Sequence, residues 1–215
     1  EATTRFAERS MTRKITEWIK YKYVDLFISY SKFILHSCEG NRKYLQKLNC
    51  SKKLFYFPCC VDNELCNSFI SNESRSLIRK ECNITDEMLV LGYSGRITNR
   101  KNLTYIAKSI NLLEANYKKN ICLLIVGGGA AEKDLIDECN KSNLPIKVVI
   151  TGFLPHVEGL KYYNAMDIFC IPSIYDPSPK VLNEAMNFSL PVLVSEYCGT
   201  VNDLVKEEYN GKSFN

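Results

Sequence analysis

Short apolar segments alternate with amphipathic ones along the last two thirds of the chain. In the amphipathic segments, apolar residues recur every three or four positions, which is the spacing of a helix with one buried face. We expect strands over residues 88–93, 121–126, 146–150, 168–171 and 192–194, and helices over 103–113, 130–142, 158–165 and 179–188. Such alternation is typical of a parallel sheet covered on both faces. It predicts a Rossmann-like, doubly wound α/β domain whose ligand lies at the carboxyl ends of the strands.

The first third of the chain has a less regular pattern. We expect an amphipathic helix over residues 5–21, a strand over 24–30, a helix over 32–48 and a strand over 54–57. The polar stretch 61–72 is interpreted as a linker. The sequence therefore predicts two domains, residues 1–66 and residues 67–215.

The charge is distributed unevenly between these two parts. Residues 1–60 hold 12 Lys and Arg against 5 Asp and Glu, a net charge of +7, whereas the remainder holds 16 against 19, a net charge of −3. A basic first part can face anionic lipid or a phosphorylated substrate. It can equally be a solvated face, or pair with sequence outside this chain. Nucleic acid is not expected, because aromatic residues are not interleaved with the basic ones.

Composition excludes several other classes of protein. With 46% hydrophobic and 24% charged residues, the chain is typical of a globular protein, and it contains no run of eighteen apolar residues that would predict a membrane span. The ten cysteines are scattered without a CxxC pair, and only two histidines are present, so we expect reduced thiols and no zinc site. Because the chain begins with Glu1 rather than Met and has no apolar signal segment behind it, we expect a piece of a longer protein, and the reduced thiols predict a cytoplasmic location.

The segments that follow the expected strands carry the candidate chemistry. Arg96 and Lys101 flank the start of a helix, where free N–H groups already favour an anion, and both side chains can grip a phosphate. A solvated basic loop is the alternative. The run 127–129 is all glycine but lacks the spacing of a dinucleotide or P-loop fingerprint, so we interpret it as a tight turn.

Two carboxylates with seven residues between them lie in the loop and helix that follow the strand expected over 168–171. Ser178 is a good N-cap and Pro179 a good first helical residue, so the helix should begin there. Asp176 then precedes the helix and Glu184 lies within it, which lets both line one pocket and accept hydrogen bonds from hydroxyl groups. Taken singly, the Asp would belong to a turn and the Glu to a solvated helix face.

In this order, the motifs resemble those of the glycosyl transferases group 1, the retaining GT-B enzymes of glycosyltransferase family 4. The motifs are Gly95-Arg96 with Lys101-Asn102, Ile125-Val126-Gly127, Gly152-Phe153, Ala165-Met166-Asp167 with Pro172-Ser173, Asp176 with Glu184-Ala185-Met186, Pro191-Val192, and Gly199. The resemblance is close over residues 88–214 and weaker before them. It implies that residues 1–66 are the end of an acceptor-side domain with its hinge, and that 67–215 bind a nucleotide-sugar donor.

The resemblance also implies roles for individual residues. Arg96 and Lys101 match the cations on the donor diphosphate, Glu184 matches the carboxylate on the ribose hydroxyls, and Asp176 replaces the Glu that contacts the donor sugar. Further donor contacts are implied for Gly95, Gly127, Phe153, Leu154, Ser178, Lys180, Val181, Gly199 and Thr200. Pro177 and Pro179 remove two backbone N–H donors beside these positions. His36 and His156 match no motif and are expected to be structural or surface residues.

The activity implied by the resemblance is sugar transfer from a UDP- or GDP-sugar to a carbohydrate or lipid-linked acceptor, with retention of configuration. Protein cations would stabilise the leaving diphosphate, so no metal or other cofactor is expected. Polysaccharide or glycolipid synthesis, with peripheral contact at the inner membrane face, is the expected setting. Two alternatives stay open: a non-catalytic nucleotide-sugar-binding fragment, and a GT-B nucleotide-sugar epimerase.

Overall fold

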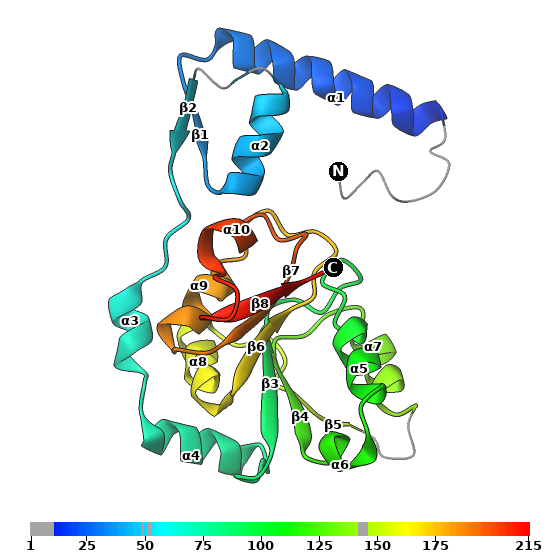
Figure 1. Cartoon of the computed structure of the whole chain (residues 1–215), viewed down its shortest axis with the longest axis vertical. Helices are drawn as coiled ribbons and strands as arrows, with labels where there is room; N and C mark the ends of the chain where they lie inside the picture. The colour runs from blue at the N-terminus through cyan, green and yellow to red at the C-terminus, as the bar shows by residue number, and fades with distance from the viewer. Residues whose placement is uncertain (1–10, 49, 51–52, 142–145) are drawn as a thin grey trace. The chain divides into compact units, whose positions relative to one another are not determined.

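A computed structural model describes residues 11–48, 50, 53–141 and 146–215. The chain divides into two compact units, Glu1–Cys59 and Cys60–Asn215. Figure 1 shows the elements of each unit. The assignment of an acceptor-side domain and a donor-binding domain, with a boundary at residues 66 and 67, stays a prediction.

The first unit is a small β–α–β arrangement preceded by a long helix. Its elements are α1 (Met11–Tyr30), β1 (Ile34–His36), α2 (Glu39–Lys47) and β2 (Leu54–Tyr56). The two strands pair in parallel, with Ile34 opposite Leu54. The Lys53 ammonium donates to the backbone oxygen of Ser31 at 2.8 Å, which ties the end of α1 to the start of β2.

Two predictions for this unit were wrong. Residues 24–30 form the last two turns of α1 rather than a strand, and the predicted helix over 32–48 is split into β1 and α2. A short apolar run fits both periodicities, and α1 contains neither Gly nor Pro to end it earlier. The helix ends where the Ser31 hydroxyl donates to the Phe27 oxygen at 2.6 Å. The helix predicted over 5–21 is confirmed from residue 11 onward, and residues 5–10 lie outside the described residues.

The second unit is a three-layer α/β domain. Its strands are β3 (Leu89–Ser94), β4 (Ile121–Val126), β5 (Lys147–Ile150), β6 (Ile168–Ile171), β7 (Val192–Ser195) and β8 (Gly211–Phe214). Its helices are α3 (Asn63–Ser68), α4 (Asn72–Glu81), α5 (Thr104–Asn111), α6 (Ala115–Lys118), α7 (Glu132–Cys139), α8 (His156–Lys161), the 3-10 turn η2 (Tyr162–Ala165), α9 (Lys180–Asn187) and α10 (Val201–Leu204). All five strands predicted after residue 88 are present.

The strand order explains where a ligand can bind. The six strands are ordered β5-β4-β3-β6-β7-β8, and every pair is parallel. Along the chain, β4 and β5 are added on one side of β3, and β6, β7 and β8 are then added on its other side. A crevice forms where the order reverses, outside the carboxyl ends of the strands. The predicted doubly wound sheet is thereby confirmed.

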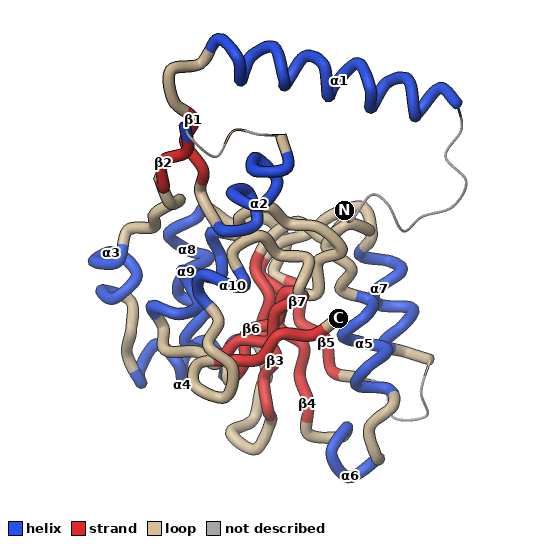
Figure 2. Tube along the Cα trace, turned by 45° about the horizontal axis from the view of Figure 1, so that its top comes forward, coloured by secondary structure: helices blue, strands red, loops and turns tan. Residues whose placement is uncertain are grey.

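Both faces of the sheet are covered, as the continuous apolar strands predicted. In β4, Cys122, Leu124 and Val126 belong to one apolar cluster, and Ile121, Leu123 and Ile125 belong to the other. All six residues are buried. Helices α5 and α7 lie on one side of the sheet, and α4, α8 and α9 lie on the other (Figure 2).

The predicted linker over 61–72 was wrong, and some elements were missed. Asp62 caps α3 by accepting from the Leu65 N–H at 2.9 Å, and Cys66 of α3 is buried in the core of the second unit. Helix α4 lies in a polar stretch for which we predicted no helix. Strand β8 was missed because its four residues include Gly, Lys and Ser, whereas edge strands need only one apolar face.

Asp167 anchors α4 to the sheet at the end opposite the crevice. Its carboxylate accepts from Arg79 at 2.7 Å, from Arg75 at 2.5 Å and from the Val90 N–H at 2.7 Å. The Arg79 side chain is 3% exposed and donates also to the Ala165 oxygen. This motif residue therefore has a structural role, and it lies at the start of β6 rather than at its carboxyl end.

We expect Asp167→Asn to lower the free energy of unfolding by about 3 kcal/mol, because it leaves the buried Arg79 guanidinium without its counter-charge. Urea denaturation measures the change. Asp137→Asn, on the exposed side of α7, is the matched control and should change stability by no more than about 0.5 kcal/mol. Equal stability of the two variants would contradict the anchoring role.

Candidate functional site

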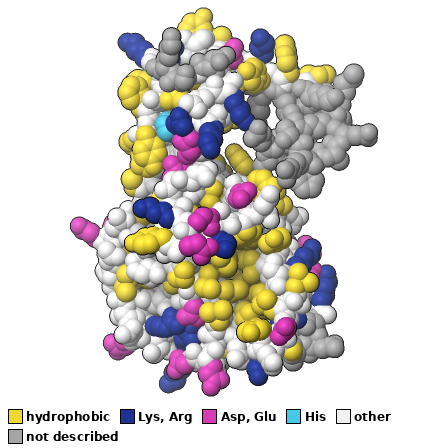
Figure 3. Space-filling view, in the orientation of Figure 1, with side chains coloured by type: hydrophobic (Ala, Val, Ile, Leu, Met, Phe, Trp, Pro, Cys, Tyr) yellow, Lys and Arg dark blue, Asp and Glu magenta, His cyan; other side chains and the backbone are white. Residues whose placement is uncertain are grey.

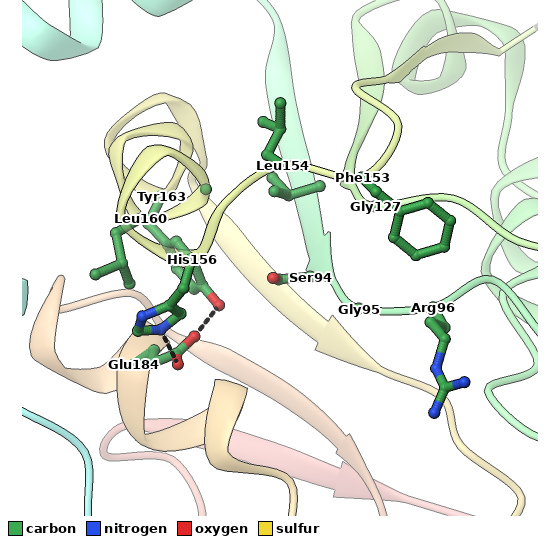
Figure 4. Close-up of a pocket in the computed structure, with 12 residues that line it drawn as sticks. Ser94, Gly95, Arg96, Gly127, Phe153, Leu154, His156, Leu160, Tyr163 and Glu184 are labelled. Carbon is green, nitrogen blue, oxygen red and sulfur yellow. Dashed lines mark hydrogen bonds and ion pairs between the residues drawn. The ribbon is translucent and has the colours of Figure 1, made fainter.

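A cavity of about 270 Å³ lies at the carboxyl ends of β3 and β4. It is lined by the loop after β3, the end of β4, the loop before α8, the α8–η2 segment and Glu184 of α9 (Figure 4). Of the residues predicted to bind the donor, Gly95, Arg96, Gly127, Phe153, Leu154 and Glu184 line it. The fold therefore gathers residues that lie up to 89 positions apart in the sequence around one cavity.

Bare backbone forms the floor between the first two loops. Gly95 and Gly127 have φ values of +135° and +137°, a region that L side chains rarely adopt. A Cβ atom on Gly127 would stand 2.2 Å from the Gly95 carbonyl oxygen. The Gly95 N–H donates to the Val126 oxygen at 2.9 Å. Gly127 is therefore needed for the loops to approach each other, which supports our interpretation of the glycine run as a tight turn.

Glu184 presents a buried carboxylate at the cavity wall. It is 6% exposed, and each of its oxygens has a partner: the Tyr163 hydroxyl donates to Oε2 at 2.7 Å, and His156 Nε2 lies 2.9 Å from Oε1. Tyr163 was not identified from the sequence, and His156 was predicted to be a structural or surface residue. The contacts join residues 21 and 28 positions apart, so no local pattern could have signalled them.

Arg96 supplies a cation across the cavity from Glu184 (Figure 4). Its side chain is exposed, and within the described residues it makes no ion pair. Phe153, which is 71% exposed, stands beside Gly128 at the cavity mouth. Two groups of opposite charge therefore line one cavity: a cation that makes no ion pair among the described residues, and a carboxylate that can accept hydrogen bonds from hydroxyl groups.

Lys101 and Asp176 do not line this cavity and instead pair with each other. The Lys101 ammonium donates to Asp176 Oδ2, and both side chains are mostly buried. The backbone carbonyl oxygen of Asp176 accepts from the Gly199 N–H at 2.8 Å, which joins the loop after β6 to the loop after β7. The N–H of Gly199, a residue that the resemblance implied to contact the donor, is therefore already bonded within the protein.

The start of α9 also differs from the prediction by one residue. The helix begins at Lys180, and Pro179 is the N-cap with φ −71° and ψ 104°. The proline ring fixes φ but leaves ψ free, and the extended ψ keeps Pro179 outside the helix. Ser178 therefore precedes the cap, while Lys180 and Val181 form the first turn. Thr200 is 6% exposed, and its hydroxyl oxygen has no hydrogen-bond partner among the described residues.

Neither a metal-binding cluster nor a membrane-spanning helix occurs in the part of the chain that the structure describes. These residues contain no group of three His, Cys, Asp or Glu side chains that could hold a metal ion. None of their helices is both long enough and apolar enough to cross a membrane. The expectation that the chemistry needs no metal stays a prediction.

Comparison with known proteins shows clear similarity. The family model described as "Glycosyl transferases group 1" matches residues 74–214. The chain is 28% identical over 172 residues to the Campylobacter jejuni GalNAc-alpha-(1->4)-GalNAc-alpha-(1->3)-diNAcBac-PP-undecaprenol alpha-1,4-N-acetyl-D-galactosaminyltransferase, covering 80% of this chain and 43% of that protein. It is 26% identical over 215 residues to the Escherichia coli UDP-Gal:alpha-D-GlcNAc-diphosphoundecaprenol alpha-1,3-galactosyltransferase, covering 96% of this chain and 53% of that protein.

Among solved structures, Anabaena Alr3699/HepE in complex with UDP has the same fold. The TM-score is 0.74 at 17% identity, over 89% of this chain and 52% of that chain. The chain thus spans about half the length of the relatives it matches.

We expect Gly127→Ala to lower the free energy of unfolding by about 3 kcal/mol, because the new Cβ strains the backbone and collides with the Gly95 oxygen. Gly128→Ala is the matched control: its Cβ would meet nothing closer than 3.6 Å, and its cost should stay within about 1 kcal/mol. Urea denaturation compares the two. If Gly127→Ala were no more destabilising than its neighbour, the close approach of the loops would not be needed for folding.

Proposed function

The chain belongs to the glycosyl transferases group 1, and we propose that it transfers a sugar from a UDP- or GDP-sugar donor to a carbohydrate or lipid-linked acceptor, with retention of configuration. The second unit binds the donor in this proposal. Acceptor binding belongs to the first unit together with sequence beyond this chain, because the relatives are about twice as long.

The observation that carries the proposal is that Arg96 and Glu184 lie on opposite walls of one cavity. A guanidinium can bind the diphosphate with two parallel hydrogen bonds. A carboxylate can accept hydrogen bonds from the two ribose hydroxyls. Phe153 and Leu154 line the same cavity, and their backbone is proposed to contact the base.

In the reaction, the bond between the anomeric carbon and the diphosphate oxygen breaks, and its electron pair goes to the diphosphate. The acceptor oxygen forms the new bond from the same face, and its proton passes to the departing diphosphate. Negative charge therefore grows on the phosphates, where Arg96 and Lys101 are proposed to stabilise it. Asp176 is paired with Lys101, and both oxygens of Glu184 already have partners, so neither carboxylate is proposed as a covalent nucleophile.

The names of the relatives support the donor and acceptor classes. The Escherichia coli relative is named for UDP-Gal and a diphosphoundecaprenol-linked sugar, and the Campylobacter relative is named for an undecaprenol-linked glycan. With a lipid-linked acceptor, the transfer reaction would take place at a membrane surface. Polysaccharide or glycolipid synthesis is the proposed setting, with a cytoplasmic location.

We expect Arg96→Met and Lys101→Met each to weaken binding of a nucleoside diphosphate by about 1–3 kcal/mol, because each removes a charged hydrogen-bond donor from the phosphates. Isothermal titration with UDP and with GDP measures the change and identifies the preferred base. Lys108→Met, which removes an exposed cation from α5, is the control and should leave binding unchanged. Unchanged affinity in both site variants would contradict the donor site.

We also propose that α1 contacts an anionic membrane surface. Several of its large apolar side chains are exposed, among them Trp18 at 62% and Phe27 at 70%. On the face shown in Figure 3, the first unit exposes hydrophobic side chains beside Lys and Arg. Burial of apolar area and attraction to anionic headgroups act together in such a helix.

We expect the chain to co-sediment with vesicles that contain anionic lipid at low salt and to be released at high salt, because salt screens the headgroup charges. Trp18→Ala combined with Phe27→Ala should weaken the binding, whereas Tyr117→Ala, an exposed aromatic residue on the second unit, should not. If the protein binds at neither ionic strength, α1 packs against other protein instead.

A further inference from the structure

The charge of Glu184 is placed where water can hardly reach it. A carboxylate that is 6% exposed would be strongly destabilised without hydrogen-bond donors. The structure supplies one donor to each oxygen, and these come from two adjoining segments, α8 and η2. The orientation of the carboxylate plane is therefore fixed by its neighbours before any ligand binds.

Tyr163 is the more rigid of the two donors. Its side chain is 1% exposed, and its ring is stacked against Phe169 at 5.4 Å and Phe188 at 5.2 Å between ring centroids. The ring cannot swing without disturbing the core, so the hydroxyl stays 2.7 Å from Glu184 Oε2. The position of one carboxylate oxygen is thus set by core packing.

The hydroxyl of Tyr163 also keeps its proton. Burial raises its pKa well above the usual value, and the negative charge of Glu184 raises it further. The Ser94 side chain at the end of β3 lowers the pKa of the same hydroxyl, but burial outweighs this effect. Tyr163 therefore remains a hydrogen-bond donor at neutral pH.

His156 holds the other oxygen from the solvent side. Its side chain is 62% exposed, and its Nε2 lies 2.9 Å from Glu184 Oε1. Nε2 must carry a proton, because a lone pair there would face the carboxylate charge. Each oxygen keeps a further lone pair that can accept from a ligand in the cavity.

We propose that Tyr163, assisted by His156, is a positioning residue that orients the Glu184 carboxylate for the vicinal hydroxyls of the donor ribose. Two hydroxyl groups on adjacent carbons match the two oxygens of one carboxylate only when its plane is fixed. The inference rests on the proposed function, since it needs a nucleotide in the cavity. It assigns roles to Tyr163 and His156, which contact the Glu184 carboxylate and not the reacting atoms.

The test compares UDP with 2′-deoxy-UDP by isothermal titration (or GDP with its 2′-deoxy form, if GDP is the tighter ligand). The unmodified protein should bind UDP about tenfold more tightly than 2′-deoxy-UDP, because the missing hydroxyl leaves the carboxylate unpaired. Tyr163→Phe removes one oxygen atom and little volume. It should weaken UDP about tenfold and the deoxy form far less, so that the preference largely disappears.

Tyr162→Phe, in the same turn, is the matched control, because the Tyr162 hydroxyl does not contact Glu184; it should keep the full preference. Should Tyr163→Phe fold poorly, His156→Ala provides the second arm, since an exposed side chain can be removed without opening the core. His156→Ala should reduce the preference for UDP over 2′-deoxy-UDP about threefold.

Each other outcome has a distinct meaning. A protein that binds neither UDP nor GDP overturns the proposed function itself. If it binds them but has no preference for the ribose 2′-hydroxyl, or if Tyr163→Phe and His156→Ala keep that preference, the positioning role is wrong. A loss of affinity for UDP and 2′-deoxy-UDP by the same factor, together with lower thermal stability, would assign Tyr163 to the core alone.

Discussion

The loops that follow β3 and β4 touch through bare backbone, and the geometry of the site depends on that contact. The Gly95 oxygen occupies the space where any side chain at residue 127 would begin. Because the loops can meet, Arg96 reaches the same cavity as residues that follow β4 and β5. The parallel sheet brings the strand ends to one edge, and the two glycines let the loops on that edge close into a site.

Around this floor, the charged groups fall into two sets. Arg96 and Glu184 face the cavity, one exposed and the other held by Tyr163 and His156. Lys101 and Asp176 pair with each other in the loops that follow β3 and β6. A ligand with both phosphates and hydroxyl groups would meet a cation that is unpaired among the described residues and a carboxylate that is already oriented. Transfer of a charged leaving group needs this kind of preorganisation.

The sequence predicted the strands of the second unit well, because residues such as Leu123 and Leu124 are buried on opposite faces and leave a continuous apolar run. It failed where a short apolar run fits two periodicities, as at the end of α1, and where an edge strand is polar, as in β8. Motif order indicated Arg96 and Glu184 but could not separate them from Asp167, which belongs to the same set of motifs and lies at the other end of β6. The Tyr163 and His156 contacts arise from tertiary packing and leave no pattern in the sequence.

Hydrogen–deuterium exchange with and without a nucleoside diphosphate tests the central claim most directly, because it locates the ligand without any substitution. With UDP or GDP at saturation, exchange should slow in residues 94–103, 152–163 and 173–184, which surround the cavity and the loops beside it. Exchange in residues 104–118, which cover α5 and α6, should not change. Slower exchange confined to the first unit, or to the end of the sheet where Asp167 lies, would contradict a donor site at the carboxyl ends of the strands.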